Sequence, residues 1–118
     1  MLNKTEKLDV QNGALSEITS ADFAAEVLSS KQPILVEFWT PWSRPCQVLD
    51  SVLQKVATDY AGKIKVRKVN ADCLDLSLVY DIQSVPTLLC FVKGNPNWRV
   101  VGTATSAAIK AKLNGLLE

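Results

Sequence analysis

The sequence predicts an α/β domain with three layers, in which a central mixed sheet of about five strands has helices on both faces. Strand-like apolar runs alternate with helical stretches in the order β-α-β-α-β-α-β-β-α, and this alternation is typical of parallel strands joined by helices. The segment KGNPN, residues 93–97, separates the last two strand-like runs with turn-forming residues, which predicts an antiparallel hairpin at one edge. A chain of 118 residues is long enough for one domain with its own core.

The domain is predicted to begin at residue 14. Residues 1–13 are mostly polar and are expected to form a flexible arm, so that a single domain covers residues 14–118. Residues 14–18 are expected to form a short edge strand. Thr19 or Ser20 then caps a helix, because both residue types are favoured N-caps and apolar side chains follow at three- and four-residue spacing.

The middle of the chain contains the strongest patterns. PILVEFW, residues 33–39, is apolar and rich in strand formers, which predicts a strand buried on both faces. Residues 44–60 have apolar side chains on one helical face, and Gly62 ends this long helix. Residues 64–70 then form the next strand.

The last third is predicted to contain the remaining elements in quick succession. Residues 75–82 form a short helix, and residues 85–92 form another buried strand. After the KGNPN turn, residues 98–102 form its hairpin partner. Ser106 caps the last helix, which has leucine and isoleucine side chains on its inner face.

Composition excludes several classes of function. The net charge is +1 and no basic run stands out, so we expect neither nucleic-acid nor membrane binding. Histidine is absent, which excludes Cys-His and Ser-His catalysis and removes the commonest zinc ligand. The cysteines Cys46, Cys73 and Cys90 form no C-x-x-C pair, and an odd number favours a reducing compartment. We therefore expect a cytoplasmic or organellar protein without signal peptide, membrane helix, metal or other cofactor.

Four short motifs together resemble one known family. VEFWTPWSRPC (36–46), KVNAD (68–72), SVPTLLCF (84–91) and VVGTAT (100–105) resemble, in this order and spacing, the active-site, lysine, cis-proline and glycine segments of thioredoxins. The resemblance extends from about residue 14 to 118. It implies a thioredoxin fold and a thiol–disulfide oxidoreductase lineage in cell redox homeostasis and electron transport. Implied partners are disulfide-bearing proteins and a thioredoxin reductase, and we expect a monomer.

The chain departs from the family at the attacking sulfur. The family motif is W-C-x-P-C, whereas this chain has Ser43 at the first cysteine position. A hydroxyl needs an adjacent base to become a nucleophile, so Ser43 cannot replace the thiolate and is expected to act as a helix N-cap. Cys46 then lacks its partner: it is either a buried small apolar residue or a slow monothiol, whose thiolate the charge of Arg44 would favour.

A carboxylate inside the predicted buried strand also requires an explanation. Glu37 lies in the middle of residues 33–39, where an acidic side chain is rarely found without a partner. The resemblance implies that Glu37 handles a proton beneath Cys46 and that Lys68 is its partner. The alternative is a buried Glu37–Lys68 ion pair without catalytic use.

The resemblance also implies a surface that binds client proteins. Pro86 matches the cis-proline, and the backbone of Val85 would pair with an extended client segment. A shallow face around it is expected to contain Trp42, Arg44, Pro45, Val85, Pro86, Gly102 and Thr103. Trp39 is expected to pack beneath the site. Cys90 is interpreted as an inert core thiol, and Cys73 as a surface thiol that is inert or forms an adduct.

Two functional hypotheses follow from these residues. In the first, the chain is an oxidoreductase in its dithiol form, and it is impaired here because engineering replaced the attacking cysteine with Ser43. In the second, it is a natural redox-inactive or monothiol module that binds proteins in a docking or chaperone-like role. A purely structural domain is the third interpretation, and the retained docking residues argue against it.

Overall fold

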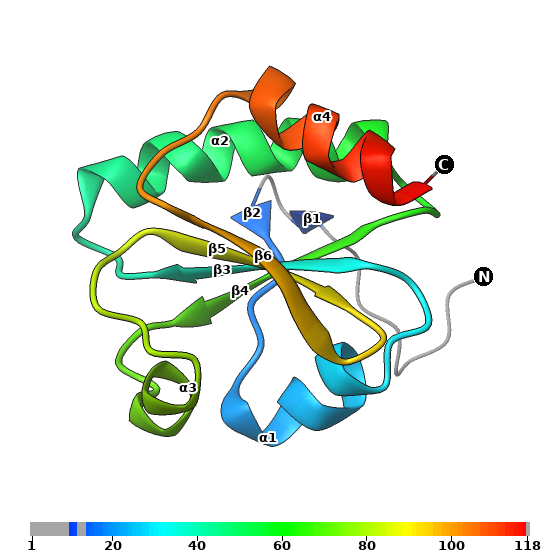
Figure 1. Ribbon diagram of the computed structural model, residues 1–118. Coiled ribbons are helices and arrows are strands. Elements are labelled where there is room, and N and C mark those ends of the chain that lie inside the picture. Colours follow the sequence, from blue (N-terminus) through cyan, green and yellow to red (C-terminus); the bar gives the residue numbers. More distant parts are fainter. Residues whose placement is uncertain (1–9, 12–13, 118) are drawn as a thin grey trace.

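A computed structural model describes residues 10–11 and 14–117 and contains a four-stranded mixed sheet (Figure 1). The strand order is β4-β3-β5-β6, with β3 parallel to β4 and antiparallel to β5, and β6 antiparallel to β5. The strands are β3 (Ile34–Trp39), β4 (Lys65–Asn70), β5 (Thr87–Val92) and β6 (Asn95–Val101). The predicted α/β class with a mixed sheet is confirmed.

Helices cover both faces of this sheet, as predicted (Figure 1). The long helix α2 and the C-terminal helix α4 pack on one face, and α1, its continuation η1, and α3 lie on the other. The helices are α1 (Ser20–Phe23), η1 (Ala24–Leu28), α2 (Arg44–Asp59), α3 (Leu74–Val79) and α4 (Ser106–Leu117).

Alternation along β3 divides the core into two layers. Leu35 belongs to the cluster under α2 and α4, whereas Val36 and Phe38 belong to the cluster against α1 and α3. Successive side chains of a strand point to opposite faces. Glu37 therefore points toward α2, into the layer that also holds Cys46.

The predicted fifth strand is reduced to a single bridge. Ala14–Leu15 forms β2, which pairs with β1 (Val10–Gln11) and not with the main sheet. Glu17 alone makes a parallel bridge to Lys68, through hydrogen bonds of Lys68 to the backbone of its two neighbours. Because the chain then turns into α1, pairing ends after one residue. The main sheet in the described part of the chain has four strands, not five.

The N-terminal arm was predicted without any regular structure. β1 falls inside the segment assigned to this arm, and its pairing with β2 was not predicted. Residues 1–9 and 12–13 of the predicted arm lie outside the described residues.

Two further boundaries differ from the predictions for local reasons. β6 begins at Asn95 because Lys93 and Gly94, both with positive φ, complete the turn alone. Pro96 fits in this strand because β6 is an edge strand, where a missing N–H is tolerated. The cap of α4 is Thr105 and not Ser106, since the Ala108 N–H donates to Thr105 Oγ1 at 3.1 Å.

Candidate functional site

Ser43 lies at the N-cap of α2, directly after the loop that follows β3. Its backbone is extended, and its Oγ accepts a hydrogen bond from the Cys46 N–H at 3.3 Å. This bond satisfies one of the N–H groups that a helix leaves unpaired at its start. The predicted capping role of Ser43 is confirmed.

Cys46 lies one turn inside α2 and is only 2% exposed. Its buried side chain lies close enough to Glu37 to help raise the pKa of that carboxyl. A thiol covered to this extent meets bulky reagents slowly. The structure therefore places Cys46 where the family resemblance expected it, but gives it little access to solvent.

The other two cysteines lie apart from Cys46 on other elements. Cys90 is fully buried in β5, and burial raises the pKa of its thiol to about 12. Cys73 is half-buried at the start of α3, and its Sγ lies 3.1 Å from Asp75 Oδ1. Within residues 10–11 and 14–117, no three His, Cys, Asp or Glu side chains gather in a group that could hold a metal ion.

Glu37 is completely buried beneath Cys46. Burial, more than any other factor, raises the pKa of its carboxyl to about 10, and the nearby Asp50 and Cys46 add to this effect. Lys68 opposes the rise. Neither carboxyl oxygen accepts a hydrogen bond from a described donor, and a hydrogen bond between the protonated Glu37 carboxyl and Asp50 contributes to the raised pKa. Glu37 is therefore neutral at physiological pH, since an unpaired buried charge is costly.

Lys68 pairs with Asp50, which the sequence analysis did not identify. Its Nζ lies 3.2 Å from Asp50 Oδ2 and 3.8 Å from the centre of the Trp39 ring. Although Glu37 and Lys68 are register partners on adjacent strands, no direct ion pair joins them, so the structure shows neither the Lys68 partnership that the resemblance implied nor the alternative buried ion pair. The missed signal was helical spacing: Asp50 follows Cys46 by four residues and shares its face of α2.

A shallow groove of about 600 Å³ borders the start of α2. It is formed by the first turns of α2, the loop before β5 and the loop after β6, and its lining residues are Arg44, Pro45, Val48, Val85, Pro86, Gly102 and Thr103. Six of these were predicted as one surface, and the structure brings them together. Val48 was missed, although it follows Arg44 by one helical turn. Trp42 does not line the groove and is 75% exposed.

Two backbone features hold the groove loops in place. The Val85–Pro86 peptide bond is cis, and the Gly102 N–H donates to the Pro86 carbonyl oxygen at 2.8 Å. Gly102 has φ of +91°, a conformation that side chains disfavour. A glycine is therefore needed where the loop after β6 meets the loop before β5.

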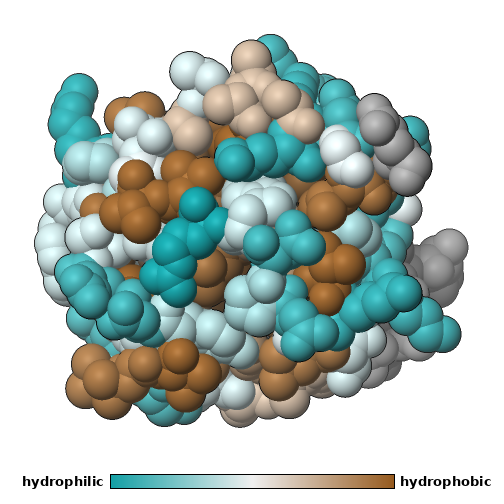
Figure 2. All heavy atoms as spheres, viewed as in Figure 1, coloured by the Kyte–Doolittle hydropathy of each residue, from teal (hydrophilic) through white to brown (hydrophobic). Residues whose placement is uncertain are grey.

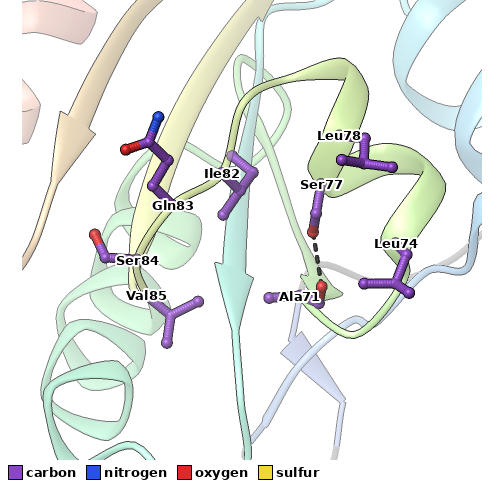
Figure 3. Close-up of a pocket in the computed structure, with 8 residues that line it drawn as sticks. All are labelled: Ala71, Leu74, Ser77, Leu78, Ile82, Gln83, Ser84 and Val85. Carbon is purple, nitrogen blue, oxygen red and sulfur yellow. Dashed lines mark hydrogen bonds between the residues drawn. The ribbon is translucent and has the colours of Figure 1, made fainter.

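A second hollow, of about 320 Å³, lies on the other side of Val85 (Figure 3). It is formed by Ala71, α3 and the loop that follows α3, and two of its lining residues are joined by a hydrogen bond from Ser77 Oγ to the Ala71 carbonyl oxygen. Leu74 and Leu78 border it and are 70% and 80% exposed. Figure 2 shows apolar surface at the lower left, where α3 lies in the same view.

A mixed sheet between helices, with a helix that begins at a W-S-R-P-C segment beside a cis-proline loop, defines the thioredoxin-fold class. The family model described as Thioredoxin matches residues 14–115. A thioredoxin of Mycobacterium tuberculosis strain H37Rv is 36% identical over 110 residues, which are 92% of this chain and 95% of that protein. The chain belongs to the thioredoxin family.

Two other relatives support the same assignment. Thioredoxin 1 of Nostoc sp. is 40% identical over 101 residues, covering 85% of this chain and 94% of that protein. A bifunctional thioredoxin reductase/thioredoxin of Mycobacterium leprae is 34% identical over 115 residues, covering 96% of this chain and 25% of that protein. In the described part of this chain, no helix has the length and apolar character needed to cross a membrane.

Proposed function

We propose that this chain is a thioredoxin-type protein of the thiol–disulfide exchange lineage in which the attacking sulfur alone is missing. The observation that carries the proposal is the position of Ser43: it caps α2 at the edge of the groove formed by Val85, Pro86 and Gly102. A thiolate at that position would be stabilised by the unpaired N–H groups and the dipole of α2. A sulfur there would attack a client disulfide, and Cys46, one turn along, would resolve the mixed disulfide.

Ser43 stops this chemistry at its first step. No histidine exists in the chain to activate the hydroxyl, and its Oγ is engaged as the acceptor of the Cys46 N–H. Cys46 keeps a sulfur but is 2% exposed, so any activity as a monothiol is slow. In this form the chain binds clients without reducing them at a useful rate.

The groove beside Val85 is the proposed client-binding surface. β5 begins at Thr87, so the backbone of Val85 lies outside the sheet ladder and can pair with an extended client segment. Its walls are largely apolar, and Arg44 supplies a positive charge at the edge formed by α2. The proposed partners are therefore proteins that expose an extended segment around a disulfide.

A thioredoxin reductase is the proposed electron donor of the dithiol form. Support comes from the Mycobacterium leprae relative, whose name joins a reductase to a thioredoxin in one protein. The free state of all three cysteines agrees with a reducing compartment, for which we propose the cytoplasm.

A second candidate is a redox-inactive docking or chaperone-like module. The capping bond from Cys46 to Ser43 favours it, because serine has a structural role at this position without any redox chemistry. Both candidates use the same groove. They differ in whether the site reduces disulfides once a cysteine replaces Ser43.

Insulin reduction by this chain and by its Ser43→Cys variant separates the two candidates. We expect the variant to reduce insulin catalytically with electrons from a thioredoxin reductase, and the unaltered chain to show no turnover above the rate with reductant alone. Ser43→Ala is the matched control, because it removes the hydroxyl without adding sulfur. If the Ser43→Cys variant is as inactive as Ser43→Ala, the oxidoreductase proposal fails and the docking module remains.

Residual monothiol chemistry is tested by incubation of the unaltered chain with oxidised glutathione. Mass spectrometry of the digested protein should find slow glutathione addition at Cys46, because this thiol directly follows the groove residues Arg44 and Pro45 in α2. Addition confined to Cys73 would show that Cys46 has no reactivity of its own.

A further inference from the structure

The carboxyl groups beneath Cys46 outnumber the cations that could neutralise them. Among the described residues, the titratable groups that act on Glu37 are Cys46 and Asp50 from α2 and Lys68 from β4. On its other side Glu37 is paired in register with Leu88 of β5, which is apolar. One ammonium group therefore faces two carboxyl groups, of which Glu37 is fully buried and Asp50 is partly exposed.

The ammonium group of Lys68 is committed to one of the two carboxyls. Its Nζ lies 3.2 Å from Asp50 Oδ2, and the ring of Trp39 covers it from another side at 3.8 Å. Lys68 is nevertheless a register neighbour of Glu37 on the adjacent strand. The Lys68 ammonium group therefore pairs with Asp50 and not with Glu37 only as long as a carboxylate is present at position 50.

Several buried oxygen atoms around this pair lack a separate donor group. Asp50 Oδ1 and both oxygens of Glu37 are buried and accept no hydrogen bond from a described donor group, but a protonated Glu37 carboxyl can donate to Asp50, and this hydrogen bond contributes to the raised pKa of Glu37. A second carboxylate here would be a buried charge with no cation of its own, which is costly. The arrangement is stable with one carboxylate and one protonated carboxyl.

We propose that Asp50 is a positioning residue of this site: by pairing with the Glu37 carboxyl and by holding the ammonium group of Lys68, it keeps that carboxyl protonated beneath Cys46. The inference deepens the proposed function, because Glu37 is the group expected to handle protons for Cys46. It makes the state of that proton depend on a residue of α2 that follows Cys46 by four positions. Asp50 acts on Glu37 through its own hydrogen bond and charge as well as through Lys68, and it needs no contact with a client.

The test is a titration of Glu37 itself by carbon-13 NMR, in the unaltered chain with labelled glutamate carboxyl carbons. The Glu37 signal is assigned by its loss in the Glu37→Gln variant. In Asp50→Asn, the ammonium of Lys68 has Glu37 as its remaining carboxylate neighbour, and an opposite charge at this range lowers a carboxyl titration midpoint by about 1 to 3 pH units. We expect a fall of this size.

Two further variants make the result specific. Asp59→Asn is the matched control, because Asp59 lies on the same helix and pairs with a different lysine, Lys110. It should leave the Glu37 midpoint unchanged. Lys68→Gln removes the cation, so the midpoint should stay at or above that of the unaltered chain, and this holds as a test even if Asp50→Asn fails to fold.

An unchanged Glu37 midpoint in Asp50→Asn, an equal fall in Asp59→Asn, or a fall in Lys68→Gln would each overturn the inference. The titration needs no catalysis. If the Ser43→Cys variant is inactive while the midpoint falls in Asp50→Asn, the proposed function fails and the role of Asp50 stands. If the Ser43→Cys variant is active while the Glu37 midpoint stays unchanged in Asp50→Asn, only the proposed role of Asp50 is rejected.

Discussion

Glu37 keeps its proton in the folded protein over a pH range in which the unfolded chain has lost it. Its carboxyl has no exposed surface, and burial raises its pKa from 4.5 to about 10. Between these two values the folded state binds one proton more than the unfolded state. The free energy of unfolding must therefore fall as pH rises through this window, because the unfolded chain gains stability by releasing the proton.

The Glu37→Gln variant should remove this dependence. Glutamine is neutral at every pH, so we expect the variant to lose less stability than the unaltered chain between pH 5.5 and 9, where the contribution of Glu37 is at most about 1.4 kcal/mol per pH unit. Urea unfolding at several pH values measures this slope. Glu17→Gln, at an exposed position, should follow the unaltered chain. Parallel pH slopes for Glu37→Gln and the unaltered chain would show that Glu37 is ionised in the fold.

The start of helix α2 combines a structural role with a proposed chemical role at one position. Ser43 caps the helix through its Oγ, and the same position would carry the attacking sulfur in a dithiol form. Serine is among the best N-cap residues. Under the proposed function, serine thus keeps the cap of the helix and lacks the reactivity of a thiolate.

The capping contribution of Ser43 can be measured directly. Ser43→Ala removes the acceptor of the Cys46 N–H, and loss of such a cap lowers the free energy of unfolding by about 1 kcal/mol. Ser51→Ala is the matched control on the same helix, because the Ser51 hydroxyl only donates to the Gln47 carbonyl at 3.4 Å. Urea unfolding should show the loss for Ser43→Ala alone. Equal losses in both variants would mean that the capping bond contributes nothing.

Most elements could be predicted from local patterns, because their apolar spacing and their capping or turn residues agree. The long helix was predicted over residues 44–60 and ends at Asp59, and each strand of the main sheet was anticipated within three residues of its observed start. The fifth strand was wrong because local sequence indicates an extended segment but not its partner. Residues 14–15 pair with β1, a choice made by tertiary packing.

At the scale of the whole molecule, the groove joins three segments that are distant in sequence. The order and spacing of family motifs placed α2, Val85–Pro86 and Gly102–Thr103 on one surface, which no local pattern could have done. The charge cluster beneath it was predicted less well. Lys68 has two acidic neighbours, and only the packing of α2 on the sheet shows that it pairs with Asp50.

A charge in the groove should weaken client binding without unfolding the protein. Val48 lines the groove and is 53% exposed, so Val48→Asp should fold normally and reduce the affinity for an extended disulfide-bearing peptide by about tenfold or more, because the new carboxylate loses water on binding. Leu117→Asp is the control, since Leu117 is 40% exposed on α4 and does not line the groove. Calorimetric titration of the peptide measures both. Equal affinities for the two variants would place the client elsewhere.

Disulfide formation in the Ser43→Cys variant tests the central claim most directly. The variant is equilibrated with oxidised and reduced glutathione, alkylated and analysed by mass spectrometry. We predict that the introduced sulfur and Cys46 join in one intramolecular disulfide and escape alkylation together, while Cys73 reacts as in the unaltered chain. If the introduced thiol and Cys46 both react with the alkylating reagent under oxidising conditions, restoring the sulfur does not restore the dithiol site, and the account is wrong.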